Sequence, residues 1–205
     1  MAEAPRLYLL TPPVFGPELP DRVAALLDGF DIACLRLALA TASEEEIARA
    51  ADALRPVAHA RDVPLVVADH HRLVPRLGLD GVHLGDGSRQ VRAVRQALGK
   101  DAIVGAHARA SRHEGMTAGE LGADYVSFGP VGASGLGDGT VAPPELFSWW
   151  SEMIEVPVVA EGGVTPALAG ELAGIVDFIA VGPEIWAAPE GEGAALAAIA
   201  ARLRG

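Results

Sequence analysis

The chain has 205 residues, of which 50% are hydrophobic and 21% charged, so it can bury a substantial core and is neither disordered nor a coiled coil. With 16 Lys+Arg against 27 Asp+Glu the formal net charge is −11, which argues against a nucleic-acid partner bound through a basic surface. The single cysteine, Cys34, excludes an internal disulfide, and no apolar run is long enough for a transmembrane helix or a signal peptide. We therefore expect no membrane partner and a cytoplasmic location.

Short apolar runs alternate along the chain with longer segments of helical spacing. Most of the runs show no polar alternation, which is typical of parallel strands covered on both faces. In chain order, the expected strands are 7–10, 32–35, 65–67, 81–84, 103–106, 125–128, 156–159 and 178–181. The expected helices are 19–27, 43–60, 71–77, 88–98, 111–121, 143–153, 166–172 and 194–203. Ser43 and Glu46 have the spacing of a capping box at the start of the second helix.

Eight strands alternating with eight helices predict an α/β fold, a single (β/α)8 TIM barrel that forms one domain over residues 1–205. The strand ends recur at nearly regular intervals, as repeated strand–helix units require. An open doubly wound sheet is the alternative. It is disfavoured because no strand is more polar than the others, as an edge strand would be.

Barrel enzymes carry their chemistry at the carboxyl ends of the strands, so the residues there are candidates. Arg36 could bind a phosphate through paired hydrogen bonds, or it could form an ion pair with a carboxylate such as Asp69. Asp69 could hold Mg²⁺ or cap the helix that follows it. His107 is well placed for acid–base catalysis, whereas His83, inside a strand, is more typical of a core histidine.

Glycines follow the seventh and eighth strands, where barrels commonly bind a phosphate through backbone N–H groups. We expect the N–H groups of Gly162, Gly163 and Gly182 to converge on a phosphate-sized volume; a plain tight turn is the alternative. Glu161 precedes this turn and could repel a phosphate or act as a catalytic base. We expect its carboxylate to point into the barrel mouth, toward Arg36 or a histidine, and to leave the N–H groups free.

Seven segments carry a resemblance to a known family over residues 6–186. They are Leu-Tyr-Leu-Leu-Thr (7–11), Leu-Arg (35–36), Pro-Leu-Val-Val-Ala-Asp (64–69), Asp-Gly-Val-His-Leu-Gly (80–85), Gly-Ala-Asp-Tyr-Val-Ser-Phe-Gly-Pro-Val (122–131), Pro-Val-Val-Ala-Glu-Gly-Gly-Val (157–164) and Phe-Ile-Ala-Val (178–181). Together they resemble a divergent member of the thiamine phosphate synthase/TenI superfamily. The resemblance implies a (β/α)8 barrel and a reaction that joins a pyrimidine pyrophosphate to a thiazole phosphate, releasing pyrophosphate with Mg²⁺. TenI-type relatives instead aromatise the thiazole phosphate without a metal.

The chain departs from the synthase pattern at the pyrophosphate site. The resemblance places a lysine two residues after Arg36 and another in the glycine-rich loop 129–139, where this chain has Ala38 and Gly137. That loop suits a mobile flap, and its Ser134 is the implied phosphate-binding hydroxyl. Losing two lysines weakens charge neutralisation of the departing pyrophosphate, by about 2–3 kcal/mol for each contact.

The implied metal ligands are Asp69 and Asp86, with Asp86 lying two positions before the family's second carboxylate. We expect Mg²⁺ only together with a pyrophosphate substrate, because one or two carboxylates seldom hold this ion alone. Three functions remain open: a synthase with a rebuilt metal site, a metal-free enzyme acting on a phosphorylated thiazole or other heterocycle with His107 or Glu161 as base, and a non-catalytic barrel that binds a thiamine-related phosphate. Each implies a small phosphorylated heterocycle as partner, and the chain is a possible homo-oligomer.

Overall fold

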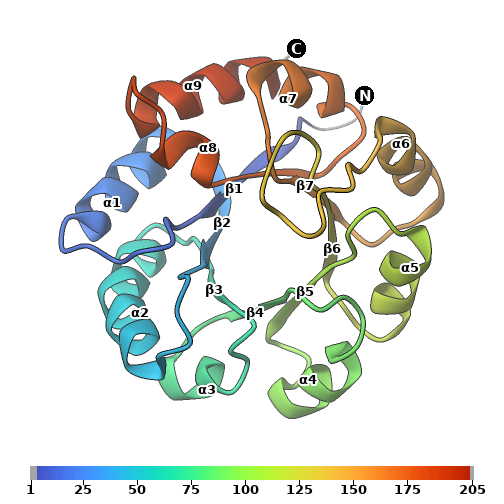
Figure 1. Cartoon of the computed structure of the whole chain (residues 1–205). Helices are drawn as coiled ribbons and strands as arrows, with labels where there is room; N and C mark the ends of the chain where they lie inside the picture. The colour runs from blue at the N-terminus through green and yellow to red at the C-terminus, as the bar shows by residue number, and fades with distance from the viewer. Residues whose placement is uncertain (1–3, 204–205) are drawn as a thin grey trace.

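The computed structural model describes residues 4–203 and shows a closed barrel of eight parallel strands in the order β1 to β8, with helices around it (Figure 1). The strands are β1 (Arg6–Leu10), β2 (Ile32–Leu37), β3 (Leu65–Ala68), β4 (Gly81–Leu84), β5 (Ile103–His107), β6 (Tyr125–Phe128), β7 (Val158–Glu161) and β8 (Phe178–Val181). β8 pairs with β1, so the sheet has no edge. The predicted TIM barrel is confirmed, and the open sheet is excluded.

The helices lie outside the barrel and follow the strands in turn. They are α1 (Leu19–Gly29), α2 (Glu44–His59), α3 (Leu73–Leu77), α4 (Val91–Leu98), α5 (Arg112–Glu120), α6 (Pro144–Met153), α7 (Pro166–Leu172), α8 (Pro183–Trp186) and α9 (Glu192–Leu203). Over residues 4–203, no helix combines the length and the apolar character needed to cross a bilayer.

Most expected elements agree with the structure to within a few residues, and two differences stand out. β7 begins at Val158 rather than at residue 156, because Pro157 has no N–H group to donate to the sheet. The one-turn helix α8 is not among the helices expected from the sequence. The expected cap of α2 is present, since the Ser43 hydroxyl accepts a hydrogen bond from the Glu46 N–H group at 3.3 Å.

Aspartates fix the strand register at the pole opposite the mouth. Each lies just before a strand and accepts a hydrogen bond from an N–H group near the start of the preceding strand in the chain. The pairs are Asp80 with Leu65, Asp124 with Val104 and Asp177 with Val158, each at 2.7 Å. These bonds tie β3 to β4, β5 to β6 and β7 to β8, and so align the carboxyl ends of the strands at the mouth.

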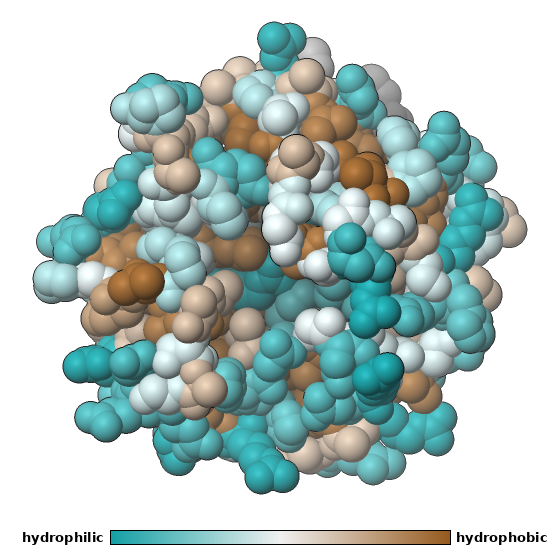
Figure 2. Space-filling view, in the orientation of Figure 1, coloured by the Kyte–Doolittle hydropathy of each residue, from teal (hydrophilic) through white to brown (hydrophobic). Residues whose placement is uncertain are grey.

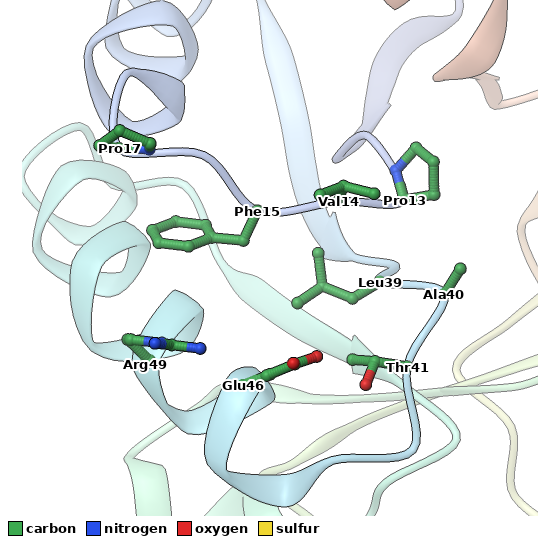
Figure 3. A pocket seen from close by; sticks show the side chains of 9 residues that line it. All are labelled: Pro13, Val14, Phe15, Pro17, Leu39, Ala40, Thr41, Glu46 and Arg49. Atoms are coloured by element: carbon green, nitrogen blue, oxygen red, sulfur yellow. The ribbon is translucent and has the colours of Figure 1, made fainter.

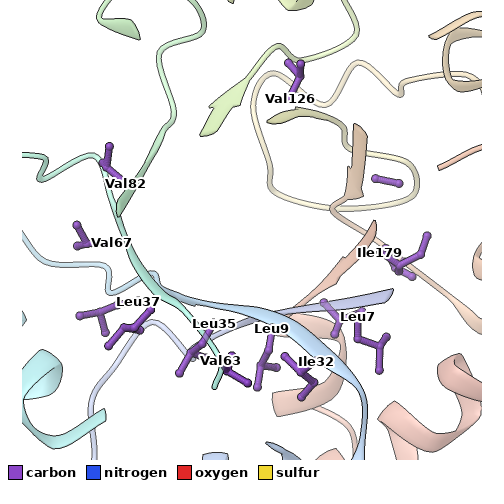
Figure 4. Packing of buried hydrophobic residues seen from close by; sticks show 14 of the residues in the cluster. Leu7, Leu9, Ile32, Leu35, Leu37, Val63, Val67, Val82, Val126 and Ile179 are labelled. Atoms are coloured by element: carbon purple, nitrogen blue, oxygen red, sulfur yellow. The ribbon is translucent and has the colours of Figure 1, made fainter. Parts of the chain in front are cut away.

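Alternation along the strands separates two hydrophobic clusters. Outward-facing side chains such as Leu9, Leu35 and Ile179 are buried between the strands and the helices (Figure 4). Inward-facing residues form a smaller cluster inside the barrel. It contains Tyr8, Cys34, Val66, Tyr125, Val159 and Ala180. This inner layer fills the barrel beneath the polar residues of the mouth.

Candidate functional site

Five polar side chains meet inside the barrel at the carboxyl ends of its strands. They are Arg36 on β2, His83 on β4, His107 on β5, Ser127 on β6 and Glu161 on β7, and each is at most 5% exposed. We call these five residues the mouth cluster. The hollow at the centre of the mouth face is lined by hydrophilic residues (Figure 2). The fold thus brings Arg36, His107 and Glu161 together, although they are far apart in the sequence.

Glu161 is the hub of the mouth cluster. Its carboxylate accepts hydrogen bonds from the Arg36 guanidinium and from the Ser127 hydroxyl at 2.5 Å. His107 Nδ1 lies 2.9 Å from the same carboxylate and 3.0 Å from the Ser127 oxygen, to which it is hydrogen-bonded. Burial opposes ionisation of this carboxyl, but the charge of Arg36 and the bond from His107 outweigh it and hold the pKa of Glu161 well below its usual range. The side chain points toward Arg36 and a histidine, as predicted.

His83 belongs to a neutral hydrogen-bonded chain beneath the hub. Its Nδ1 lies 2.9 Å from the Tyr125 hydroxyl, which lies 2.7 Å from the hydroxyl of Tyr8. Burial, reinforced by the nearby charge of Arg36, lowers the pKa of His83 well below its usual value, and burial raises that of Tyr125. These groups stay uncharged at neutral pH, which fits the core-histidine interpretation of His83.

Two atoms of the mouth cluster are buried without a partner among the described residues. They are Arg36 Nε, a donor, and His107 Nε2. Because Glu161 can only accept hydrogen bonds when ionised, His107 Nδ1 is the donor in their contact, and a neutral ring then carries its lone pair on Nε2. Buried polar atoms in proteins are usually satisfied, so these two atoms make the mouth cluster a candidate ligand site.

The two expected metal ligands lie at the ends of neighbouring strands. Asp69 follows β3, and its carboxylate accepts a hydrogen bond from the N–H group of Gly85, which follows β4, at 2.7 Å. Asp86 binds Gln90 through Oδ2 at 2.9 Å, while its Oδ1 is buried without a partner among the described residues. Asp69 does not cap α3, whose first turn has no side-chain cap.

The carboxylates of Asp69 and Asp86 suit Mg²⁺ in the kind of ligand atom they offer but not in number. The orphaned Asp86 oxygen and the Asp69 carboxylate are hard oxygen ligands of the kind that Mg²⁺ prefers. Within residues 4–203 no group of three or more His, Cys, Asp and Glu side chains is arranged to hold a metal. Two carboxylates are too few to hold Mg²⁺ by themselves, so an ion here would take its remaining ligands from substrate phosphates and water.

Two of the three N–H groups predicted to form the phosphate site, those of Gly163 and Gly182, do converge, but on a side chain, and the third N–H group there belongs to Val164 rather than to Gly162. The Gly163 and Val164 N–H groups donate to Glu184 Oε1 at 2.7 and 3.3 Å, and the Gly182 N–H group donates to Glu184 Oε2 at 2.9 Å. We call these three N–H groups the amide nest. Glu161 leaves the nest free, as expected, but Glu184 fills it. Sequence reasoning missed Glu184, although an acidic residue in the first turn of a helix after a glycine is a known partner of free N–H groups.

The flap, the loop 129–139 that follows β6, packs against the nest. The carbonyl of Gly162 accepts hydrogen bonds from the N–H groups of Val131 and Gly132 at 2.8 and 3.1 Å. A Cβ atom at Gly162 would lie 2.8 Å from Leu136 Cδ2. The flap is seen in Figure 1 as the yellow loop beside the end of β7. Ser134 is exposed on it, and its hydroxyl accepts a hydrogen bond from the Leu136 N–H group of the same loop at 3.2 Å.

A separate pocket of about 380 Å³ lies at the rim, between the loops that follow β1 and β2 (Figure 3). Its lining is largely apolar, with Glu46 and Arg49 contributed by α2. It contains none of the expected site residues.

Comparison with known proteins gives a consistent result. Residues 7–185 match the family model described as thiamine monophosphate synthase. The chain is 46% identical over 204 residues to the thiamine-phosphate synthase of Rhodospirillum centenum, covering 98% of each chain. It is 38% identical over 192 residues to that of Erythrobacter litoralis, covering 90% of each. Among solved structures it resembles the thiamine phosphate pyrophosphorylase of Pyrococcus furiosus, with a TM-score of 0.84 and 26% identity over 97% of this chain and 95% of the other.

Proposed function

This chain belongs to the thiamine monophosphate synthase family, and from that premise we propose that it is a thiamine-phosphate synthase. It joins a pyrimidine pyrophosphate to a thiazole phosphate and releases pyrophosphate. The observation that carries the proposal is the identity of 46% over 98% of both chains with a protein of that name. The arrangement of charges in the mouth supports it.

In the proposed reaction, the pyrophosphate lies at the ends of β3 and β4. Asp69 and Asp86 together with phosphate oxygens would hold Mg²⁺, which would neutralise the charge that develops on the leaving pyrophosphate. Arg36 contributes through Nε, the donor that has no protein partner among the described residues. Its Nη2 stays on Glu161, so the guanidinium is held in one orientation for the substrate.

Arginine replaces lysine as the source of further positive charge in the mouth. The chain has a single lysine, Lys100, and it lies between α4 and β5, at the opposite pole. Arg109 follows β5 in a left-handed backbone conformation with φ of 52°, and its carbonyl accepts the N–H group of Gly129 at 3.0 Å. Its exposed guanidinium lies 3.7 Å from Glu114, a loose contact that leaves donors for a substrate phosphate.

The thiazole phosphate lies at the other side of the mouth in this proposal. The amide nest supplies N–H groups aimed at one point, an arrangement suited to a phosphate. The flap covers this side and would exclude water from the two substrates. The substrates, as small phosphorylated heterocycles, are the partners of the proposed function.

A second candidate is favoured by His107. Its Nε2 is buried without a partner in the described structure, and Glu161 orients the ring. A base held in this way could remove a proton from a phosphorylated thiazole without a metal. The two candidates differ in whether Mg²⁺ is required.

Thermal unfolding with and without Mg²⁺ separates them. We expect the pyrimidine pyrophosphate to raise Tm with Mg²⁺ present and much less with EDTA, whereas the thiazole phosphate raises Tm in either buffer. Stabilisation by the thiazole phosphate alone would favour the metal-free enzyme. Absence of any stabilisation by the pyrimidine pyrophosphate with Mg²⁺ would overturn the synthase proposal.

A further inference from the structure

Glu184 holds the amide nest as a bound anion would. It lies in α8, two residues after Gly182, and both carboxylate oxygens are engaged by N–H groups from the loops after β7 and β8. The carboxylate accepts three hydrogen bonds, at 2.7, 2.9 and 3.3 Å. A carboxylate with this set of donors mimics the contacts that a phosphate group would make.

A phosphate and this carboxylate cannot occupy the nest together. Both are anions, and their repulsion grows as water leaves the space between them. A pocket of about 320 Å³ opens beside the nest, and its other ionisable lining residue is Glu190, which adds negative charge. No Lys or Arg side chain is among the residues that line it, so in this part of the structure nothing cationic offsets the two glutamates.

We propose that Glu184 is an internal competitor for the phosphate group of the thiazole substrate, and that the substrate must displace it to enter the nest. The inference rests on the proposed function, because it takes the nest as the phosphate subsite. The half-buried side chain can turn out into the pocket without movement of the strands. The binding-competent state is the one in which it has turned out, so the apparent affinity is reduced by the fraction of molecules in that state.

Displacement of Glu184 costs every ligand of the nest the same free energy, so it lowers the apparent affinities for inorganic phosphate and for the thiazole phosphate by the same factor. Inorganic phosphate makes no ring contacts in the mouth and starts from the weaker affinity. The common reduction therefore keeps free phosphate out of the nest at concentrations at which the complete substrate still binds.

The test is calorimetric titration of the full chain with the thiazole phosphate, with its unphosphorylated alcohol and with inorganic phosphate. We expect Glu184→Ala to bind the thiazole phosphate about 10- to 100-fold more tightly than the wild type, since three hydrogen bonds no longer have to be broken. Affinity for inorganic phosphate should rise by a similar factor, while affinity for the alcohol, which has no phosphate group, should stay the same. Glu190→Ala is the matched control: it removes the same charge from the same pocket and touches none of the three N–H groups, so a change below about threefold is expected.

Equal or weaker binding of the thiazole phosphate by Glu184→Ala would overturn the proposal and assign Glu184 the structural role of bracing the two loops. Absence of binding by both wild type and variant would overturn it together with the phosphate subsite itself. If Glu184→Ala does not fold, a crystal structure of the wild type with the thiazole phosphate decides. A phosphate on Gly163 and Gly182 with Glu184 turned away supports displacement, and a phosphate elsewhere with Glu184 still in the nest contradicts it.

Discussion

At the residue scale, the Arg36–Glu161 pair is a buried ion pair whose disruption strongly destabilises the barrel. Both side chains are almost fully buried, and neither charge has another fully charged partner in the described cluster. Removing one member of such a pair leaves an uncompensated charge in a poorly solvated place. The pair therefore couples the stability of the barrel to the geometry of its mouth.

Glu161→Gln removes the charge and keeps the shape. We expect the free energy of unfolding, measured with urea, to fall by about 3–5 kcal/mol, because Arg36 is left buried and unpaired. The exposed pair Arg6–Asp31 is the control, and Asp31→Asn should cost at most about 1 kcal/mol. Since Glu161 does not touch the amide nest, affinity for the thiazole phosphate should stay nearly unchanged. A large gain in that affinity would mean that Glu161 blocks the site.

His83 makes the stability depend on pH below neutrality. The folded protein keeps this histidine neutral, while the unfolded chain binds a proton below about pH 6.5. The unfolded state thus holds more protons in acid, and stability rises with pH up to about 6.5. We expect unfolding free energy to drop between pH 7 and pH 5, and His83→Asn to flatten this slope. The exposed His113→Asn variant should keep the wild-type slope, and the same slope in His83→Asn would refute this assignment.

Arg109 is expected to act on the pyrophosphate substrate. Arg109→Ala removes a cation beside the flap, and we expect KM for the pyrimidine pyrophosphate to rise about tenfold or more, a loss typical of a charged contact. Arg112→Ala is the control, since that guanidinium stacks on Trp149, 4.6 Å from the ring centre. Steady-state kinetics give both values. Equal effects of the two variants would show that only the overall charge matters.

At the scale of elements, the flap and the loop after β7 are packed backbone to backbone. A Cβ atom at Gly163 would lie 2.5 Å from the carbonyl carbon of Gly132 and 2.7 Å from the carbonyl oxygen of Ala133. Gly163 also has φ of +75°, a conformation that favours glycine. Only glycine allows this contact, so the loop that carries the nest also positions the flap.

Gly163→Ala should therefore lower the free energy of unfolding by more than the backbone strain of a positive φ alone would. Gly191 has φ of +88° but open space where a Cβ atom would lie, so Gly191→Ala measures the strain alone, about 1 kcal/mol. We expect Gly163→Ala to lose clearly more unfolding free energy in urea and to bind the thiazole phosphate more weakly. Equal losses in the two variants would contradict the close packing of the flap.

Elements defined by apolar runs could be predicted from the sequence, whereas contacts between loops could not. Gly81–Leu84 and Phe178–Val181 match their expected ranges because a buried parallel strand is simply an apolar run. The direction of Glu161 agrees with the expectation, but strand alternation could not fix it, because the Gly-Gly turn distorts the end of the strand. The occupation of the nest by Glu184 depends on side-chain torsions and on how two loops approach each other. Neither can be predicted from the local sequence pattern.

At the scale of the whole molecule, one pole of the barrel fixes the register of the strands and the other carries the candidate site. Asp80, Asp124 and Asp177 cap strands at one pole, where the only lysine also lies. The other pole carries the mouth cluster, the two candidate metal ligands and the nest. This division is the usual one for barrels, in which the carboxyl ends of the strands carry the chemistry. It lets residues of the mouth vary without loss of the fold.

The most direct test is formation of thiamine phosphate by the purified chain from the pyrimidine pyrophosphate and the thiazole phosphate. We expect turnover with Mg²⁺, one pyrophosphate released for each product, and loss of turnover in EDTA. Asp69→Asn should lower kcat/KM by about 100-fold or more, and Asp101→Asn, at the opposite pole, should leave it unchanged. A chain that folds and binds the thiazole phosphate but makes no thiamine phosphate with Mg²⁺ would contradict the proposed function.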